Sequence, residues 1–220
     1  MQAGTSSAPR FALTFDDGPD PLWTPLVLDA LARSRARATF FVVAPQARRY
    51  PSLLARMRNA GHGVGFHCTE HARHDAMTAA EIESDVVRGL PALVDPVSVW
   101  RTPWGVVTPA TKQIARKHRL TLVGWTADTE DWRGSPRDEM LARVEGDLLA
   151  NSIVLMHDGV GPGATRDNCA ETVDAIIPLV HLCRSRGLEP GPLHELGRPL
   201  ADRNPDYPVA RTSLGRHRLV

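Results

Sequence analysis

The chain has too few cysteines for a protein held together by disulfides. Its 220 residues contain three, Cys68, Cys169 and Cys183. They are scattered along the sequence, and their odd number leaves at least one thiol free. A reducing compartment is therefore the simpler expectation.

An excess of charge of one sign is also missing. Lysine and arginine together number 26 and the acidic residues 25, which gives a formal net charge of +1. Such a balance produces no strong field that would draw the chain to nucleic acid or to an anionic membrane. A neutral partner is expected.

Long hydrophobic runs are absent as well. No stretch approaches the roughly 20 apolar residues of a membrane-spanning helix. The first ten residues, MQAGTSSAPR, lack the apolar segment of a secretory signal. The sequence predicts no membrane insertion and a cytoplasmic location for the chain as given, or a secreted one if a leader has been removed.

What the sequence does contain is a regular alternation of short apolar runs with segments of helical periodicity. This alternation, with 42% hydrophobic residues, predicts one α/β domain built on a parallel sheet. We expect residues 1–9 to form a short N-terminal segment ahead of the domain and residues 10–197 to form the domain itself. Residues 198–220, rich in Pro and Arg, are expected to form a C-terminal tail. Strands are expected at residues 11–15, 38–43, 63–67, 97–101, 120–126 and 152–156.

Capping residues indicate where the helices begin. Thr24 before Pro25 and Thr108 before Pro109 each place an N-cap ahead of a proline suited to the first helical turn. Thr78 and Glu81 have the spacing of a capping box ahead of a helix over residues 82–93. Two further helices are expected at residues 137–149 and 169–185, the second ended by Gly187.

Five polar motifs follow the expected strands, all but the one at residues 38–43. Active sites of parallel barrels lie at the carboxyl ends of their strands, so these motifs are expected to meet. They are TFDDGP at 14–19, HCTEH at 67–71, RTPWG at 101–105, DTEDW at 128–132 and LMHD at 155–158.

The first motif places two carboxylates side by side. Because Asp16 and Asp17 repel each other, a functional site would separate their roles, for example a metal ligand and a base. The alternative is an ordinary Asp-Gly turn with both charges in solvent.

The second motif offers two imidazoles. On a helical turn, His67 and His71 would lie on one side and, with Asp17, would supply two nitrogens and one oxygen to a divalent metal. The alternative is a surface helix with two uninvolved histidines. His74 is a candidate fourth ligand, although exposure to solvent is the favoured interpretation.

Four other residues have ordinary alternatives of their own. Arg101 could form a simple ion pair, Trp132 and Leu155 could belong to the core, and His157 could be a buried structural histidine. The position of His157 after an apolar strand and before Asp-Gly favours a role in chemistry.

Together, the five motifs resemble those of the NodB-homology polysaccharide deacetylases, carbohydrate esterase family four, over residues 11–196. The resemblance implies a distorted (β/α) barrel of about seven parallel strands that removes N-acetyl or O-acetyl groups from a sugar. It also implies a divalent metal, most often zinc and sometimes cobalt or another ion. An acetylated sugar or oligosaccharide is the expected partner, and the oligomeric state stays open.

The resemblance also assigns roles by position. Asp16 would be the general base, tuned by Arg101, and His157 the general acid, oriented by Asp131. Asp17, His67 and His71 would bind the metal. Pro103, Trp104, Trp132 and Leu155 are expected to contact the substrate. Beside the resemblance, the chemistry of amide hydrolysis requires donors to the oxyanion, which the metal and a backbone N–H within residues 101–105, that of Trp104, would supply.

Two positions depart from the family pattern. Cys68 stands where Ser or Thr usually helps to hold the loop, and Thr69 is the residue that would compensate. Trp104 replaces a more usual Tyr or Phe and keeps the aromatic character.

Two other functions compete with a carbohydrate deacetylase. One is a deacetylase of a small acetylated metabolite or natural product, which the short chain and the missing leader favour. The other is a carbohydrate-binding protein without activity, which would need neither Asp16 nor His157.

Overall fold

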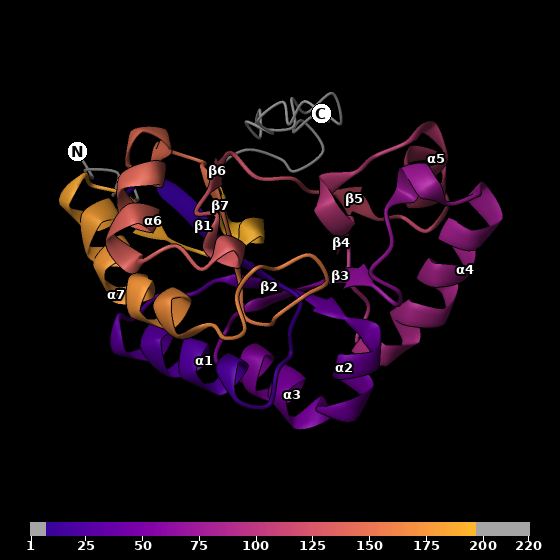
Figure 1. Ribbon diagram of the computed structural model, residues 1–220, viewed down its shortest axis with the longest axis horizontal. Helices are drawn as coiled ribbons and strands as arrows, with labels where there is room; N and C mark the ends of the chain where they lie inside the picture. The colour runs from indigo at the N-terminus through magenta and orange to yellow at the C-terminus, as the bar shows by residue number, and fades with distance from the viewer. Residues whose placement is uncertain (1–7, 197–220) are drawn as a thin grey trace, which may run out of the picture.

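A computed structural model describes residues 8–196 of the chain. Its centre is a curled sheet in which every strand pairing is parallel (Figure 1). The strand order is β5-β4-β3-β2-β1-β7-β6, and the short β8 pairs with the start of β1. The predicted distorted (β/α) barrel of about seven parallel strands is confirmed. The predicted tail at 198–220 lies outside the described residues.

The strands are short, and four of those described, β4, β5, β6 and β8, have two residues each. Their bounds are β1 Arg10–Asp16, β2 Thr39–Val43, β3 Gly63–Cys68, β4 Val99–Trp100, β5 Thr121–Leu122, β6 Ala127–Asp128, β7 Ile153–His157 and β8 Glu189–Pro190.

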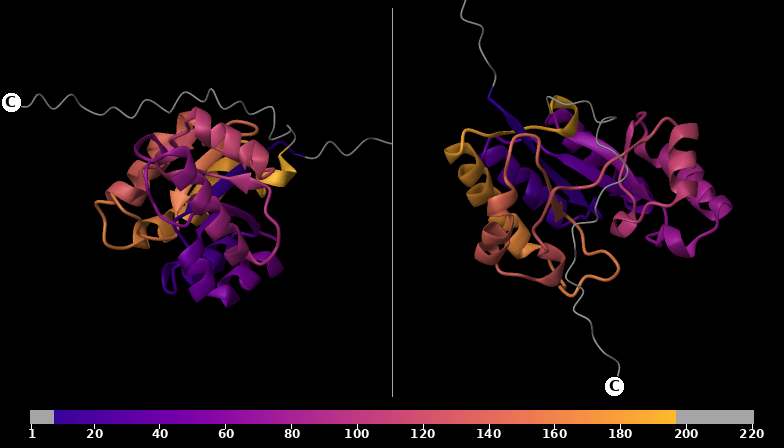
Figure 2. Two further views of the ribbon diagram at one scale, coloured as in Figure 1. Left: turned by 90° about the vertical axis from the view of Figure 1, so that its right-hand side faces the viewer. Right: turned by 90° about the horizontal axis from the view of Figure 1, so that it is seen from above.

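Helices lie around the outside of the sheet, with α6 and α7 at one end and α4 and α5 at the other (Figures 1 and 2). Their bounds are α1 Trp23–Arg33, α2 Ala44–Arg49, α3 Pro51–Asn59, α4 Ala79–Gly89, α5 Pro109–Lys117, α6 Arg137–Val144 and α7 Ala170–Ser185. None of these helices is long and apolar enough to cross a membrane.

Alternation along β1 separates two apolar clusters. Phe11, Leu13 and Phe15 belong to the large core between sheet and helices, whereas Ala12 belongs to a smaller cluster with Phe41. Because successive side chains of a strand point to opposite faces, Thr14 and Asp16 share the inner face with Ala12. The first catalytic candidate is thereby directed into the barrel.

The predicted strand at residues 120–126 is wrong as a single element. The backbone N–H of Val123 still bonds to Trp100 on one edge of the sheet, whereas that of Thr126 bonds to Ile153 near the opposite edge. The chain crosses the gap between β5 and β6 through Gly124 and Trp125. The fourth motif therefore begins in β6.

The helix starts were predicted with one error. Thr78 and Thr108 both form capping boxes, as expected. However, α1 begins at Trp23, before Thr24, and Asp20 Oδ1 accepts the N–H groups of Leu22 and Trp23. The Thr24 hydroxyl instead donates to Asp158 Oδ2.

Two helix ends were also placed too late. The segment predicted at 82–93 is helical only to Gly89 and continues as the 3-10 turn Leu90–Leu93, where Pro91 has no N–H to donate. The segment at 137–149 leaves the α conformation after Val144. The helix predicted at 169–185 is confirmed as α7, with Gly187 following at φ 74°.

Candidate active site

A cleft opens at the carboxyl ends of the strands. Residues from all five motifs line it, together with residues 161–164 of the loop after β7. Of the predicted site residues, the ones that line it are Asp16, Asp17, His67, His71, Trp104, Trp132, Leu155 and His157. The structure therefore brings together motifs from opposite ends of the domain.

Three of these side chains form the metal-binding candidate. His67 Nε2 and His71 Nε2 lie 3.4 Å and 3.2 Å from Asp17 Oδ1. Among residues 8–196, these three form the one group of His, Cys, Asp and Glu side chains close enough to share an ion. His67 lies in β3, one residue before its end, and His71 lies in the loop that follows, so the predicted helical turn is wrong even though the two rings do converge.

The donor set fits a divalent ion. Asp17 Oδ1 is buried and accepts no hydrogen bond of good geometry from the described residues. Ligand atoms around a tetrahedral zinc stand about 3.4 Å apart, close to the two separations found here. Burial alone would raise the pKa of Asp17, but His67 and His71 outweigh it, so this pKa lies well below its ordinary range.

His67 is held in the tautomer that a metal ligand needs. Its Nδ1 lies 2.8 Å from the carbonyl oxygen of Arg101, which can only accept. Nδ1 must therefore carry the proton, which leaves the lone pair of Nε2 directed toward Asp17. Burial favours the neutral ring, whereas Asp16 and Asp17 raise the pKa of His67 above its usual value.

Asp85 of α4 organises the loop between the two histidines. Its carboxylate accepts the backbone N–H groups of Thr69 and Glu70 at 2.9 Å and 2.6 Å, and its carbonyl accepts the Thr69 hydroxyl at 2.6 Å. Thr69 thus supplies the loop-holding hydroxyl that the preceding position lacks. Cys68 is buried, and burial raises its thiol pKa well above the ordinary value, which keeps the sulfur protonated.

Asp16 occupies a different environment from its neighbour. Arg101 Nη1 donates to Asp16 Oδ1 at 2.9 Å and to the Thr14 hydroxyl at 2.7 Å. The other nitrogens of Arg101 donate to the carbonyls of Val123 and Gly124, and its guanidinium stacks over the Phe41 ring. This wholly buried arginine fixes Asp16 and ties the chain across the gap beside β5.

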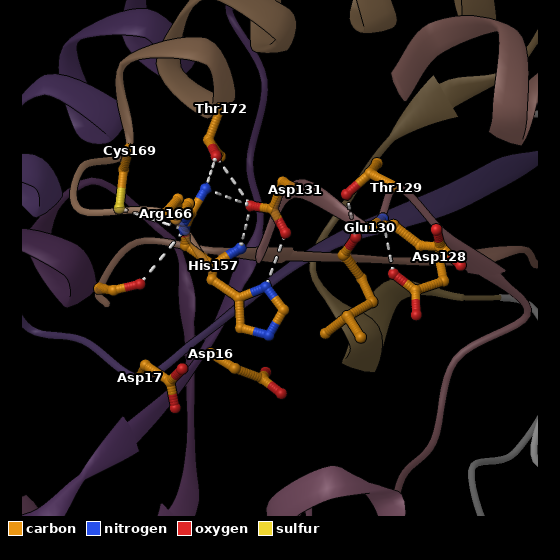
Figure 3. A network of polar contacts seen from close by, with 12 residues as sticks. Asp16, Asp17, Asp128, Thr129, Glu130, Asp131, His157, Arg166, Cys169 and Thr172 are labelled. Atoms are coloured by element: carbon orange, nitrogen blue, oxygen red, sulfur yellow. Dashed lines mark hydrogen bonds and ion pairs between the residues drawn. The ribbon is translucent and has the colours of Figure 1, made fainter. Parts of the chain in front are cut away.

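His157 and Asp131 form the second functional pair (Figure 3). His157 Nδ1 donates a hydrogen bond of 2.7 Å to Asp131 Oδ1, and the Asp131 side chain is buried. Burial opposes the charged imidazole, but the Asp131 carboxylate outweighs it and raises the pKa of His157 to about 9. Because Nδ1 faces the carboxylate, Nε2 is the atom left to exchange a proton with a substrate.

The aromatic wall of the cleft is partly as predicted. Trp104 is 40% exposed, and its ring meets the edge of His71 at 4.3 Å between centroids. Its backbone is in the left-handed region at φ 52°, a strained conformation for a bulky residue that tends to mark functional sites. Pro103 is buried and does not line the cleft, so its predicted direct contact with substrate is not supported.

Among the lining residues that sequence reasoning missed are a tryptophan and an aspartate. Trp125 forms part of the wall and Asp128 adds a further carboxylate. Burial raises the pKa of Asp128 to about 6, although the N–H of Glu130 opposes the shift. The first position of the DTEDW motif was a signal for Asp128, whereas Trp125 stood inside an apparent strand.

Both predictions for His74, a fourth metal ligand or a solvent-exposed side chain, are wrong. It is buried, and its Nδ1 lies 2.9 Å from the Thr111 hydroxyl. It is therefore neither a ligand in the cluster described above nor exposed to solvent. Its burial lowers its pKa to about 4, so the ring stays neutral.

Comparisons with known proteins agree with this arrangement. The chain is 34% identical over 195 residues to a chitooligosaccharide deacetylase of Bradyrhizobium sp., covering 84% of this chain and 89% of that one. Its fold matches a peptidoglycan N-acetylglucosamine deacetylase with a TM-score of 0.78 and 28% identity, over 85% and 87% of the two chains. It also matches a family 4 carbohydrate esterase from Streptomyces lividans, solved with acetate, with a TM-score of 0.75 and 29% identity, over 83% and 92%.

The family profile for polysaccharide deacetylases extends over residues 3–123, more than half of the chain. That segment contains the base candidate, all three metal-ligand candidates and Arg101. With the relatives above, it shows that the chain belongs to the polysaccharide deacetylase family.

Proposed function

We propose that the chain is a metal-dependent hydrolase that removes N-acetyl, or alternatively O-acetyl, groups from a carbohydrate and releases acetate. The observation that carries the proposal is the presence in one cleft of a three-ligand cluster, a fixed carboxylate and a carboxylate-paired imidazole. The relatives named above act on chitooligosaccharides and peptidoglycan, according to their names. That supports a sugar carrying an acetamido group as the substrate.

The ion would be held by Asp17, His67 and His71. Three protein ligands leave positions open for water and substrate, as catalytic zinc sites do, and cobalt would fit the same donor set. When bound, the ion would polarise the acetyl carbonyl and make the attacking water more acidic.

The residues around the ion divide the proton transfers. Asp16 would accept the proton of the attacking water, while Arg101 keeps its carboxylate in place. The backbone N–H of Trp104 would donate to the oxyanion that forms, a contribution worth about 10² to 10³ in rate at comparable sites. Trp104, Trp132 and Leu155 would position the sugar and its acetyl group.

His157 would protonate the departing amine from Nε2. An unperturbed imidazole has a pKa of about 6.5. Asp131 raises the pKa of His157 to about 9, so the acid is protonated throughout the neutral range. The binding-only alternative gives no reason for this pairing, because a protein that only binds sugar needs no proton donor.

Acetate release tests the proposal. Metal-stripped protein should be inactive on chitooligosaccharides, peptidoglycan fragments, acetylated xylan and small N-acetyl amino sugars, and zinc or cobalt should restore release from at least one of them. The ranking of substrates separates a polymer deacetylase from one acting on small metabolites. Stoichiometric metal without release from any substrate would contradict the proposal.

A further inference from the structure

Arg166 is a buried arginine outside the five sequence motifs. It lies in the loop between β7 and α7, and its side chain is 5% exposed. Figure 3 shows its guanidinium beside Asp131, on the side of that carboxylate away from the His157 ring. A buried charge of this kind is costly unless it is paired. Its Nε has no hydrogen-bond partner among the described residues, so the contacts of its two terminal nitrogens indicate what it does.

The two terminal nitrogens bind different parts of the site. Nη1 donates to Asp131 Oδ2 at 3.1 Å and also to the Thr172 hydroxyl. Nη2 donates to the carbonyl oxygens of His157 and Gly159, each at 3.2 Å. One side chain thus holds both the carboxylate partner of His157 and the main chain on which His157 is carried.

The oxygens of Asp131 are used unequally. Besides Arg166, Oδ2 accepts the Thr172 hydroxyl at 2.8 Å and the backbone N–H of His157 at 2.9 Å. In the described part of the chain, the hydrogen bond found at Oδ1 is that from the His157 ring. Three donors on one oxygen fix the carboxylate plane and leave the other oxygen for the imidazole.

Charge balance supports the same role. Asp131 is buried, which alone favours its neutral form, and His157 and Arg166 together keep it ionised. Thr172 contributes a hydroxyl to both Arg166 and Asp131, which closes a three-membered network at the start of α7. Such partners of functional groups commonly set the geometry of the groups that they bind.

We propose that Arg166 is a positioning residue, which orients Asp131 and thereby holds His157 Nδ1 so that Nε2 faces the substrate. The role rests on the proposed function, because it concerns the proton donor of that reaction. The competing interpretation is that Arg166 only anchors the loop ahead of α7 and contributes to stability.

Arg184, at the other end of α7, provides a matched control. Like Arg166, it binds one carboxylate, that of Glu189, and two carbonyl oxygens, those of Ser34 and Arg35. None of these three partners lines the cleft. Arg184→Gln should therefore lower stability and leave catalysis unchanged.

The kinetic test compares Arg166→Gln and Arg166→Lys with this control in the metal-loaded full chain. Arg166→Gln should reduce kcat by about 10- to 100-fold while KM changes little, because proton donation and not sugar binding is impaired. Lysine keeps the charge but not the planar fork, so Arg166→Lys should recover part of the loss. A kcat within twofold of wild type in both variants would overturn the proposal.

A double-mutant cycle tests the route of the effect. If Arg166 acts through Asp131, adding Arg166→Gln to Asp131→Asn should reduce kcat little further, since the effects of residues in one network are not additive. If the fold-losses in kcat of the two single variants multiply in the double variant, Arg166 acts independently of Asp131 and the proposal is overturned.

A third readout does not need turnover. In zinc-loaded protein, the Nδ1 proton of His157 should give a downfield NMR resonance, identified by its loss in His157→Gln. It should be shifted or broadened in Arg166→Gln and unchanged in Arg184→Gln. An unchanged resonance in Arg166→Gln would overturn the inference, whereas absent turnover in wild type with these NMR differences intact would count against the proposed function alone.

Discussion

Asp16 and Asp17 are adjacent in sequence, yet the structure gives them different partners. Asp16 is paired with the buried Arg101, and Asp17 faces two imidazoles from a left-handed backbone conformation at φ 75°. The change of direction at Asp17 sends one carboxylate into the barrel and the other toward the histidine loop. The different partners separate two groups that would otherwise repel each other.

Asp131→Asn should shift the alkaline limb of the pH–rate profile to lower pH. The acid must be protonated to act, so activity should fall as pH rises through the His157 pKa of about 9. Asp131 stabilises the imidazolium; removing its charge lowers that pKa, and activity is lost earlier on the alkaline side. The profile of kcat against pH measures the shift, and an unmoved alkaline limb would show that another group supplies the proton.

The residue identities of this site could be read from the sequence, because each motif follows a strand and the carboxyl ends of parallel strands meet. The environments of these residues could not be read from the sequence. The size of the shift in the His157 pKa, the buried position of His74 and the contact of Arg166 with Asp131 depend on how separate segments of the chain pack together. The catalytic and metal-binding roles themselves stay predictions.

At the scale of elements, the loop after β3 and helix α4 act together. Asp85 reaches from α4 to the backbone of Thr69 and Glu70, which lie between the two metal-ligand candidates. The position of His71 relative to His67 is thus set partly by a helix that contains no ligand. The Thr78–Glu81 capping box, which starts α4 at Ala79, contributes to the placement of Asp85.

Asp85→Ala should weaken metal binding without removing any ligand. The freed loop would let His71 move away from Asp17, and loss of such an outer contact typically lowers affinity about 10- to 100-fold. Zinc titration against a competing chelator measures the change. Glu83→Ala on the same helix, whose carboxylate pairs with Lys117 and His118, is the control and should bind zinc normally. Equal affinities in the two variants would refute the role of Asp85.

Element boundaries were harder to predict than element types. The apolar run at residues 120–126 looks continuous, yet its two ends belong to opposite edges of the sheet. The division of such a run depends on the curvature of the whole sheet, which brings its two edges near each other. Helices α2 and α3 escaped notice because they are short and interrupted near Tyr50 and Pro51.

For the molecule as a whole, the gap between β5 and β6 is the unusual feature of the sheet. These strands lie at the two ends of the strand order and do not pair with each other in the region that the structure describes. Arg101 bonds to Val123 and Gly124 in the crossing segment and to Asp16 on β1. Its charge therefore serves both the site and the fold.

Arg101→Met should consequently destabilise the protein as well as inactivate it. Removing one partner of a buried ion pair costs about 3 to 5 kcal/mol, because the other charge stays buried without compensation. Urea unfolding at neutral pH measures the free energy of unfolding. Arg56→Met, which removes an exposed pair with Asp29, is the control and should cost at most about 1 kcal/mol. Equal losses of unfolding free energy in the two variants would mean that the buried Arg101 pair stabilises the fold no more than an exposed pair does.

The measurement that tests the central claim most directly is acetate release by zinc-loaded wild type, Asp16→Asn and His71→Ala, with the zinc content of each protein determined in parallel. The substrate is the one that wild type hydrolyses best. Asp16→Asn should keep its zinc and lose most turnover, at least about 100-fold for a missing general base. His71→Ala should lose zinc and activity together. Near-normal turnover by zinc-loaded Asp16→Asn would contradict the account, because the base would then lie elsewhere.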